Sequence, residues 1–133
     1  MKSVFVILLI LILGGCQKES PTQTEQRSAQ LGDSFELKPG EAIMITGTPV
    51  SFRFDSVLFD GRCPEGVLCF WEGNAAIIIS FPTEQDTVMT MDPHKIYKND
   101  YEVTLQKLSP YPKSNQKIPK DAYVAQLSVL KHS

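Results

Sequence analysis

Short runs of alternating apolar and polar residues follow one another through most of the chain, and this pattern predicts β-strands. The runs lie at residues 34–37, 41–46, 50–58, 70–81, 87–91, 95–97, 101–105 and 123–130. Glycine, proline and aspartate separate them, and no segment after residue 16 shows helical spacing over three turns. The pattern predicts an all-β fold: a single antiparallel β-sandwich, immunoglobulin-like or a small-barrel variant.

The run at residues 70–81 is the most strand-like, and apolar side chains on both of its faces predict a central strand. One face is expected to carry five apolar side chains: Trp71, Ala75, Ile77, Ile79 and Phe81. Gly73 interrupts the run, which predicts a bulge or the close approach of another backbone segment.

Two other runs carry predictions about register. In residues 50–58, four apolar side chains fall on one face and are expected in the core: Val50, Phe52, Phe54 and Leu58. Leu108 breaks the alternation that begins at Tyr101, so we expect a bulge near Gln106 and Lys107.

The first 16 residues follow a different pattern. After Lys2, residues 4–13 are all apolar. A membrane-spanning helix needs roughly 20 such residues, whereas this shorter run fits the apolar core of a signal peptide. The run leads into Leu-Gly-Gly-Cys at residues 13–16, which resembles the lipobox of bacterial lipoproteins. The resemblance implies cleavage before Cys16, acylation of that residue (with palmitate, for example) and attachment to a membrane through the N-terminal lipid.

Residues 1–15 are therefore interpreted as a lipoprotein signal peptide in the envelope of a bacterium. Residues 16–30 are interpreted as the lipidated Cys16 and a flexible polar tether, because residues 20–30 lack large apolar side chains. Residues 31–133 then form the β-sandwich domain. Residue 17 is Gln rather than Asp, so the best-known inner-membrane retention signal is absent, and we expect the outer membrane, on its periplasmic face or at the cell surface.

Charge narrows the class of partner. The net charge is −2 and becomes −3 once Lys2 is removed with the signal peptide. No basic stripe emerges, so nucleic acid is not an expected partner. No cofactor is expected either.

The chain has three cysteines. With Cys16 lipidated, Cys63 and Cys69 remain as an even pair, which indicates a disulfide in an oxidising compartment. A metal or redox pair is the alternative, but the C-x5-C spacing is not the C-x-x-C of those sites.

The segment around these cysteines has a recognisable pattern. Residues 59–73 read Phe-Asp-Gly-Arg-Cys-Pro-Glu-Gly-Val-Leu-Cys-Phe-Trp-Glu-Gly. This is similar to a D-x-R-C-P-x-x-V-x-C-x-W-x-G motif of an uncharacterised family of bacterial envelope lipoproteins. Gly61 stands where Ser is common. The resemblance implies a shared β fold with a disulfide-stapled loop, and it implies no activity.

Two interpretations of this loop stay open. A stapled loop loses little entropy on binding, so it is a candidate site for an envelope protein or a glycan, or for an inhibitor-like contact. The candidate residues are Arg62, Pro64, Glu65, Gly66, Val67 and Trp71. Alternatively, the disulfide and Trp71 only fix a long connection in a small exported domain, and this structural interpretation is the favoured one. Arg62 is expected to pair with Asp60, with Glu72 or with backbone carbonyls.

A second candidate segment covers residues 110–120. It is rich in proline and carries Lys113, Lys117 and Lys120 without an acidic residue. Such a loop could contact an anionic glycan or a protein, but a solvated crossover between the last two strands is the favoured interpretation.

Catalytic signals are sparse. No serine lies in a G-x-S-x-G pattern. His94 is the only plausible general base in the domain, and with Asp92 and Asp100 it could bind a metal in a metal-binding or enzymatic domain. A single histidine among turn residues is more often a surface residue, so we expect no catalytic residues and no metal ligands.

Overall fold

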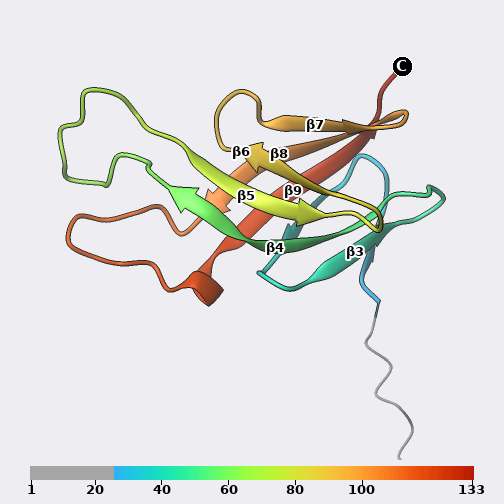
Figure 1. Cartoon of the computed structure of the whole chain (residues 1–133), viewed down its shortest axis with the longest axis horizontal. Helices are drawn as coiled ribbons and strands as arrows, with labels where there is room; N and C mark the ends of the chain where they lie inside the picture. Colours follow the sequence, from blue (N-terminus) through green and yellow to red (C-terminus); the bar gives the residue numbers. More distant parts are fainter. Residues whose placement is uncertain (1–25) are drawn as a thin grey trace, which may run out of the picture.

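The computed structural model describes residues 26–133, so Cys16 and the lipobox lie outside the described residues. Two β-sheets pack face to face (Figure 1). The larger sheet has the strand order β1 (Ser28–Ala29), β3 (Ala42–Ile45), β4 (Ser51–Asp60), β5 (Ala75–Ser80) and β6 (Gln85–Met89). The smaller sheet has the order β2 (Ser34–Leu37), β9 (Val124–Lys131), β8 (Tyr101–Ser109) and β7 (Lys95–Lys98). The prediction of an all-β sandwich is confirmed.

The core lies between the sheets and is built from the inward-facing positions of both. On β9, Ala125, Leu127 and Val129 are fully buried, as their alternation predicts. They meet side chains such as Phe54 and Ile77 from the larger sheet. All strand pairs are antiparallel except β1 with β3, which is parallel.

The sheet begins earlier than the sequence predicts. Ser28 and Ala29 pair with β3, and Arg27 forms an ion pair with Glu41 (Nη1 to Oε2, 2.7 Å). Ser28 and Ala29 therefore belong to the larger sheet, although the sequence pattern predicts no strand there. Two small residues give no alternating signal there, because backbone hydrogen bonds hold this edge and only Ala29 packs on the core.

Strand β5 is shorter than the predicted run at residues 70–81. It begins at Ala75, and Phe70 and Trp71 belong to the preceding loop, where both are exposed. The prediction that Trp71 shares the inward face of β5 is therefore wrong. Gly73, near the end of that loop, has a φ of +75°, a left-handed conformation that breaks the extended backbone.

Register shifts explain two other outcomes. β4 pairs irregularly with β5 between Phe54 and Ser56 and again between Val57 and Phe59. Val50, Phe52 and Phe54 are buried, but after these shifts Leu58 is 55% exposed, so its predicted core position is wrong. The bulge expected near Gln106 and Lys107 is confirmed by a shift between Leu105 and Lys107, which returns Leu108 to the core.

The strands run between two ends of the sandwich (Figure 1). The loop from β4 to β5 and the loop from β8 to η1 (Lys120–Ala122) extend from one end. The chain enters the sandwich at the other end, where the C-terminus also lies. Within residues 26–133, no helix is long and apolar enough to span a bilayer.

Candidate functional site

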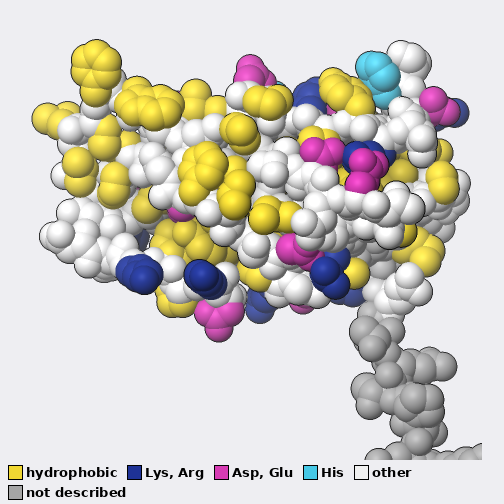
Figure 2. All heavy atoms as spheres, in the orientation of Figure 1, with side chains coloured by type: hydrophobic (Ala, Val, Ile, Leu, Met, Phe, Trp, Pro, Cys, Tyr) yellow, Lys and Arg dark blue, Asp and Glu magenta, His cyan; other side chains and the backbone are white. Residues whose placement is uncertain are grey.

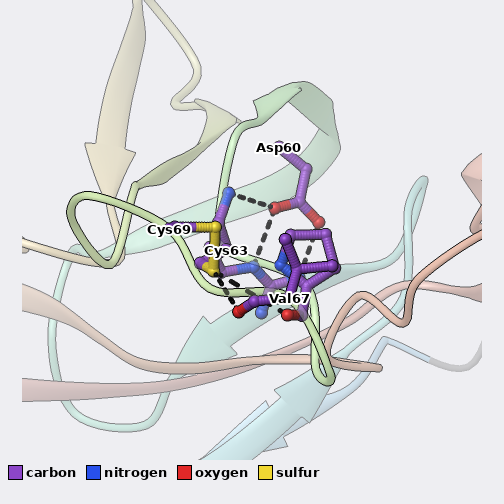
Figure 3. Close-up of a disulfide and its surroundings, with 6 residues drawn as sticks. Asp60, Cys63, Val67 and Cys69 are labelled. Carbon is purple, nitrogen blue, oxygen red and sulfur yellow. Dashed lines mark hydrogen bonds and ion pairs between the residues drawn. A yellow bond between two sulfur atoms is a disulfide. The ribbon is translucent and has the colours of Figure 1, made fainter.

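The loop between β4 and β5, residues 61–74, is closed by a disulfide between Cys63 and Cys69 (Figure 3). The predicted disulfide is therefore confirmed, with an S–S distance of 2.07 Å and a Cα–Cα distance of 5.9 Å. Pro64 and Gly66 lie inside this small ring, and Gly66 adopts a φ of +81°, which a side chain would disfavour. We refer to residues 63–71 as the stapled loop.

Arg62, directly before the stapled loop, holds the base of the loop through buried hydrogen bonds. Its guanidinium group donates two parallel hydrogen bonds to Asp60, from Nε to Oδ1 (2.8 Å) and from Nη2 to Oδ2 (2.7 Å). It also donates to the carbonyl oxygens of Leu108 (2.6 Å) and Pro110 (3.0 Å) at the end of β8. Tyr123 Oη donates to Asp60 Oδ2 (3.0 Å). Arg62, only 8% exposed, thus ties the loop to the end of β8, and Tyr123 ties it through Asp60 to the start of β9.

The electrostatics of this cluster favour the ion pair. Burial alone would raise the pKa of Asp60, but the hydrogen bonds and charge of Arg62, with the bond from Tyr123, outweigh it and hold the pKa below its ordinary value. Burial, followed by the negative charge and hydrogen bond of Asp60, raises the pKa of Tyr123 to about 12. Tyr123 is therefore a neutral hydrogen-bond donor to a charged carboxylate at neutral pH. We call Asp60, Arg62 and Tyr123 the polar clamp.

Backbone contacts close the base further. The Gly61 amide donates to the Asn74 carbonyl (2.7 Å), and the Cys63 amide donates to the Glu72 carbonyl (2.7 Å). A Cβ atom at Gly73 would lie 2.0 Å from the Gly61 carbonyl oxygen, so only glycine fits there. The close backbone approach predicted from Gly73 is therefore confirmed.

The two candidate segments of the sequence meet at this end of the sandwich. The Glu65 amide donates to the Pro112 carbonyl (3.0 Å), and the Ser114 amide donates to the Glu65 carbonyl (3.4 Å). Tyr111 places its ring 5.0 Å from Cζ of Arg62. The stapled loop and the segment 110–120 therefore support each other, although the bonded residues are 47 and 49 positions apart in the chain.

The outer side of the stapled loop is apolar. Leu68 and Phe70 are fully exposed, at 103% and 105%, and Trp71 is 67% exposed. Val67 is also exposed. Apolar side chains gather at this end in Figure 2. We call Val67, Leu68, Phe70 and Trp71 the apolar tip.

The structure separates the predicted site residues into two groups. Arg62 is buried in the polar clamp, whereas Glu65, Gly66, Val67 and Trp71 are exposed and Pro64 is half-buried. Phe70 was missed, because a phenylalanine beside an apolar run is expected in the core rather than in solvent. No sequence signal except its position directly after Cys69 distinguishes it.

The alternative site at His94 does not gain further ligands. His94 Nδ1 lies 2.7 Å from Asp92 Oδ1, and both side chains are accessible to solvent. In the part of the chain from residue 26 onward, no three His, Cys, Asp or Glu side chains are grouped closely enough to hold a metal ion. The geometry therefore favours the stapled loop as the candidate site.

Comparison with protein-family models, with curated proteins and with solved structures finds no match to this chain.

Proposed function

We propose that this chain is a lipid-anchored bacterial envelope protein whose sandwich is a binding module that docks through the apolar tip. The observation that carries this proposal is the full exposure of Leu68 and Phe70 on a loop fixed by a disulfide and a buried ion pair.

The physical argument starts from the cost of that exposure. Burying a large apolar side chain stabilises a protein by about 1.5–3 kcal/mol, so the apolar tip forgoes several such contributions in the isolated chain. Contiguous exposed apolar groups commonly mark an interaction site. Because the disulfide and the polar clamp already hold the loop, docking would order few additional groups, which favours affinity.

The membrane anchor is the second part of the proposal. It is supported by the lipobox-like residues 13–16 and by the short apolar run before them. An outer-membrane location would follow from Gln17 in place of Asp. Metabolic labelling with an alkyne analogue of palmitate tests it: the native chain should be labelled and Cys16→Ser should not. Label retained in Cys16→Ser would contradict this anchor.

The binding role is tested by cross-linking in intact cells. The native chain is compared with the double variant Leu68→Ser, Phe70→Ser, and with Leu130→Ser as a matched control. Leu130 is also an exposed leucine, but it lies near the end of β9, away from the stapled loop. We expect a cross-linked species that the double variant loses and the control keeps. Identical cross-linking in all three would contradict a binding role for the apolar tip.

A further inference from the structure

The exposed apolar surface at the loop end extends beyond the apolar tip. Tyr111 lines the same depression as the tip, and Met91 lines a second depression together with Tyr111. Tyr111 is 44% exposed and Met91 is 42% exposed. Because a large side chain buries about 150–250 Å² when it is fully covered, these two residues and the tip together offer on the order of 800 Å².

This area decides what kind of contact the surface suits. The largest apolar patch of a typical monomer is about 300–600 Å². Each partner in a standard protein interface buries about 800 Å². The loop end therefore exposes more apolar surface than a monomer commonly does, and as much as one side of a dimer interface needs.

The second depression lies beside the tip and has a volume of about 240 Å³. On one side, the ring of Tyr111 rests against Arg62, with 5.0 Å between the ring centroid and Cζ. On the other side, Asn74 Oδ1 accepts hydrogen bonds from the Thr90 hydroxyl (2.8 Å) and from the Met91 amide (3.1 Å). Both walls are thus fixed within one chain. We call this depression the Tyr111 hollow, and its apolar lining includes Met91, Leu108 and Tyr111.

Phe70 is the complement of the Tyr111 hollow. Its side chain is fully exposed, and it does not belong to the residues that line the hollow of its own chain. The hollow is wide enough for a phenyl ring, and aromatic side chains seated in pockets commonly dominate the affinity of an interface. One copy of the chain therefore carries both a projecting ring and a hollow that can receive one.

The charges beside the Tyr111 hollow are of both signs. Glu72 and Lys107 line it, both are exposed, and neither forms an ion pair within residues 26–133. A surface with one charge of each sign does not select a uniformly charged partner, but it is complementary to itself. In a twofold dimer, a residue that contacts another is contacted by the same residue in return, so two Glu72–Lys107 pairs can form.

From these observations, and resting on the proposed function, we infer that the partner of the apolar tip is a second copy of this chain. The two copies meet about a twofold axis, and Phe70 of each copy enters the Tyr111 hollow of the other. Leu68 and Trp71 pack around the point of entry and exclude water from it. Each contact is made twice, so the loss of one side chain weakens the dimer twice over.

Photo-cross-linking from position 70 tests this arrangement in intact cells. Two copies of the acylated full chain with different epitope tags are produced together, and one carries p-benzoylphenylalanine in place of Phe70. Irradiation should join the two tags in one covalent product, and mass spectrometry should locate the bond at Met91, Leu108 or Tyr111 of the second copy. The same photoreactive residue at position 130, on the exposed part of β9, serves as the matched control and should give no such product.

Variants test whether the insertion is reciprocal. With an amine-reactive cross-linker, the two-tag product should fall at least tenfold when both copies carry Phe70→Ser, because two apolar contacts are lost. It should fall equally when both carry Met91→Glu, which places a charge in the hollow. Leu130→Ser should leave it unchanged. Pairing one Phe70→Ser copy with one Met91→Glu copy keeps one of the two insertions, so this mixed pair should give more product than either variant paired with itself.

The other outcomes separate this inference from the proposed function. A product from position 70 that contains only a different protein would overturn the second copy as partner and leave the tip as a binding site. A mixed pair no better than the two single variants would overturn the reciprocal insertion. A two-tag product obtained equally from position 130 would overturn the assignment to the loop end. No product from position 70, with cellular cross-links that ignore Leu68 and Phe70, would overturn both proposals.

Discussion

The body of the sandwich and its loop end bury opposite kinds of side chain. Between the sheets, Phe54, Leu127 and their neighbours are buried, and polar groups face water. At the loop end, Arg62 is buried and the Asp60 side chain is nearly so, whereas Leu68 and Phe70 face water. The loop end is therefore stabilised by a disulfide and by charge-assisted hydrogen bonds instead of apolar burial, which leaves its apolar side chains free for an external contact.

This difference follows from the small size of the stapled loop. A closed loop of a few residues cannot surround its own apolar side chains, so a covalent bond and a bidentate arginine take the place of a core. The sandwich body therefore does not need the apolar tip for its stability. Four predictions test this division.

The largest difference is expected between two phenylalanines. Phe54→Ala should lower the free energy of unfolding by about 3–5 kcal/mol, because it leaves a cavity in the core. Phe70→Ala should change it by no more than about 0.5 kcal/mol, because the side chain is already in solvent. Urea denaturation of both variants measures this. Comparable losses would mean that the tip packs on the body.

Removing the arginine of the polar clamp should have the next largest effect. Arg62→Met leaves the Asp60 carboxylate with only Tyr123 as a side-chain partner. We expect the free energy of unfolding to fall by about 3 kcal/mol. Arg62→Lys keeps a charge but not the planar pair of donors, so its loss should be smaller. Denaturation curves again provide the measurement. An Arg62→Met variant as stable as the native chain would show that the clamp does not hold the loop end.

Opening the disulfide should cost less. The double change Cys63→Ser, Cys69→Ser should lower stability by about 2 kcal/mol, because the closed loop is short. Thermal unfolding followed by circular dichroism gives the loss. Cross-linking repeated below the melting temperature then shows the role of the staple: contacts that survive would mark it as structural only, and contacts that disappear would mark it as necessary for presenting the tip.

The remaining effect is a dependence of stability on pH. Because the pKa of Tyr123 is raised to about 12 from the ordinary 10.0, its contribution to stability is present below pH 10 and is lost as the pH rises from 10 to 12. Because the pKa of Asp60 is lowered from 3.8, its contribution is present above that value and is lost as the pH falls through the lowered pKa.

Tyr123→Phe separates the alkaline limb. It should lose part of the decline in melting temperature between pH 10 and 12, since phenylalanine has no proton to release. An identical alkaline decline in the variant and the native chain would assign the effect to other groups.

Much of the fold could be predicted because successive side chains of a β-strand point to opposite faces of the sheet. Buried apolar and exposed polar residues therefore alternate in the sequence with a period of two. The alternation at Ala125, Leu127 and Val129 gave β9, and the break at Leu108 gave the bulge in β8. The same rule misplaced Trp71 and Leu58, because a left-handed glycine and two register shifts change which side a residue faces. Neither change alters the apolar pattern itself.

The all-β class, the pairing of Cys63 with Cys69 and the close approach at Gly73 could be predicted from the residues alone, since each depends on local spacing or on residue type. The folded chain was needed to show that Arg62 is buried against the end of β8 and that segment 110–120 supports the stapled loop. It alone also placed Leu68 and Phe70 in solvent. The first two features depend on contacts between residues about 50 positions apart. The exposure of Leu68 and Phe70 could not be predicted because the identity of an apolar residue does not reveal whether another part of the fold covers it.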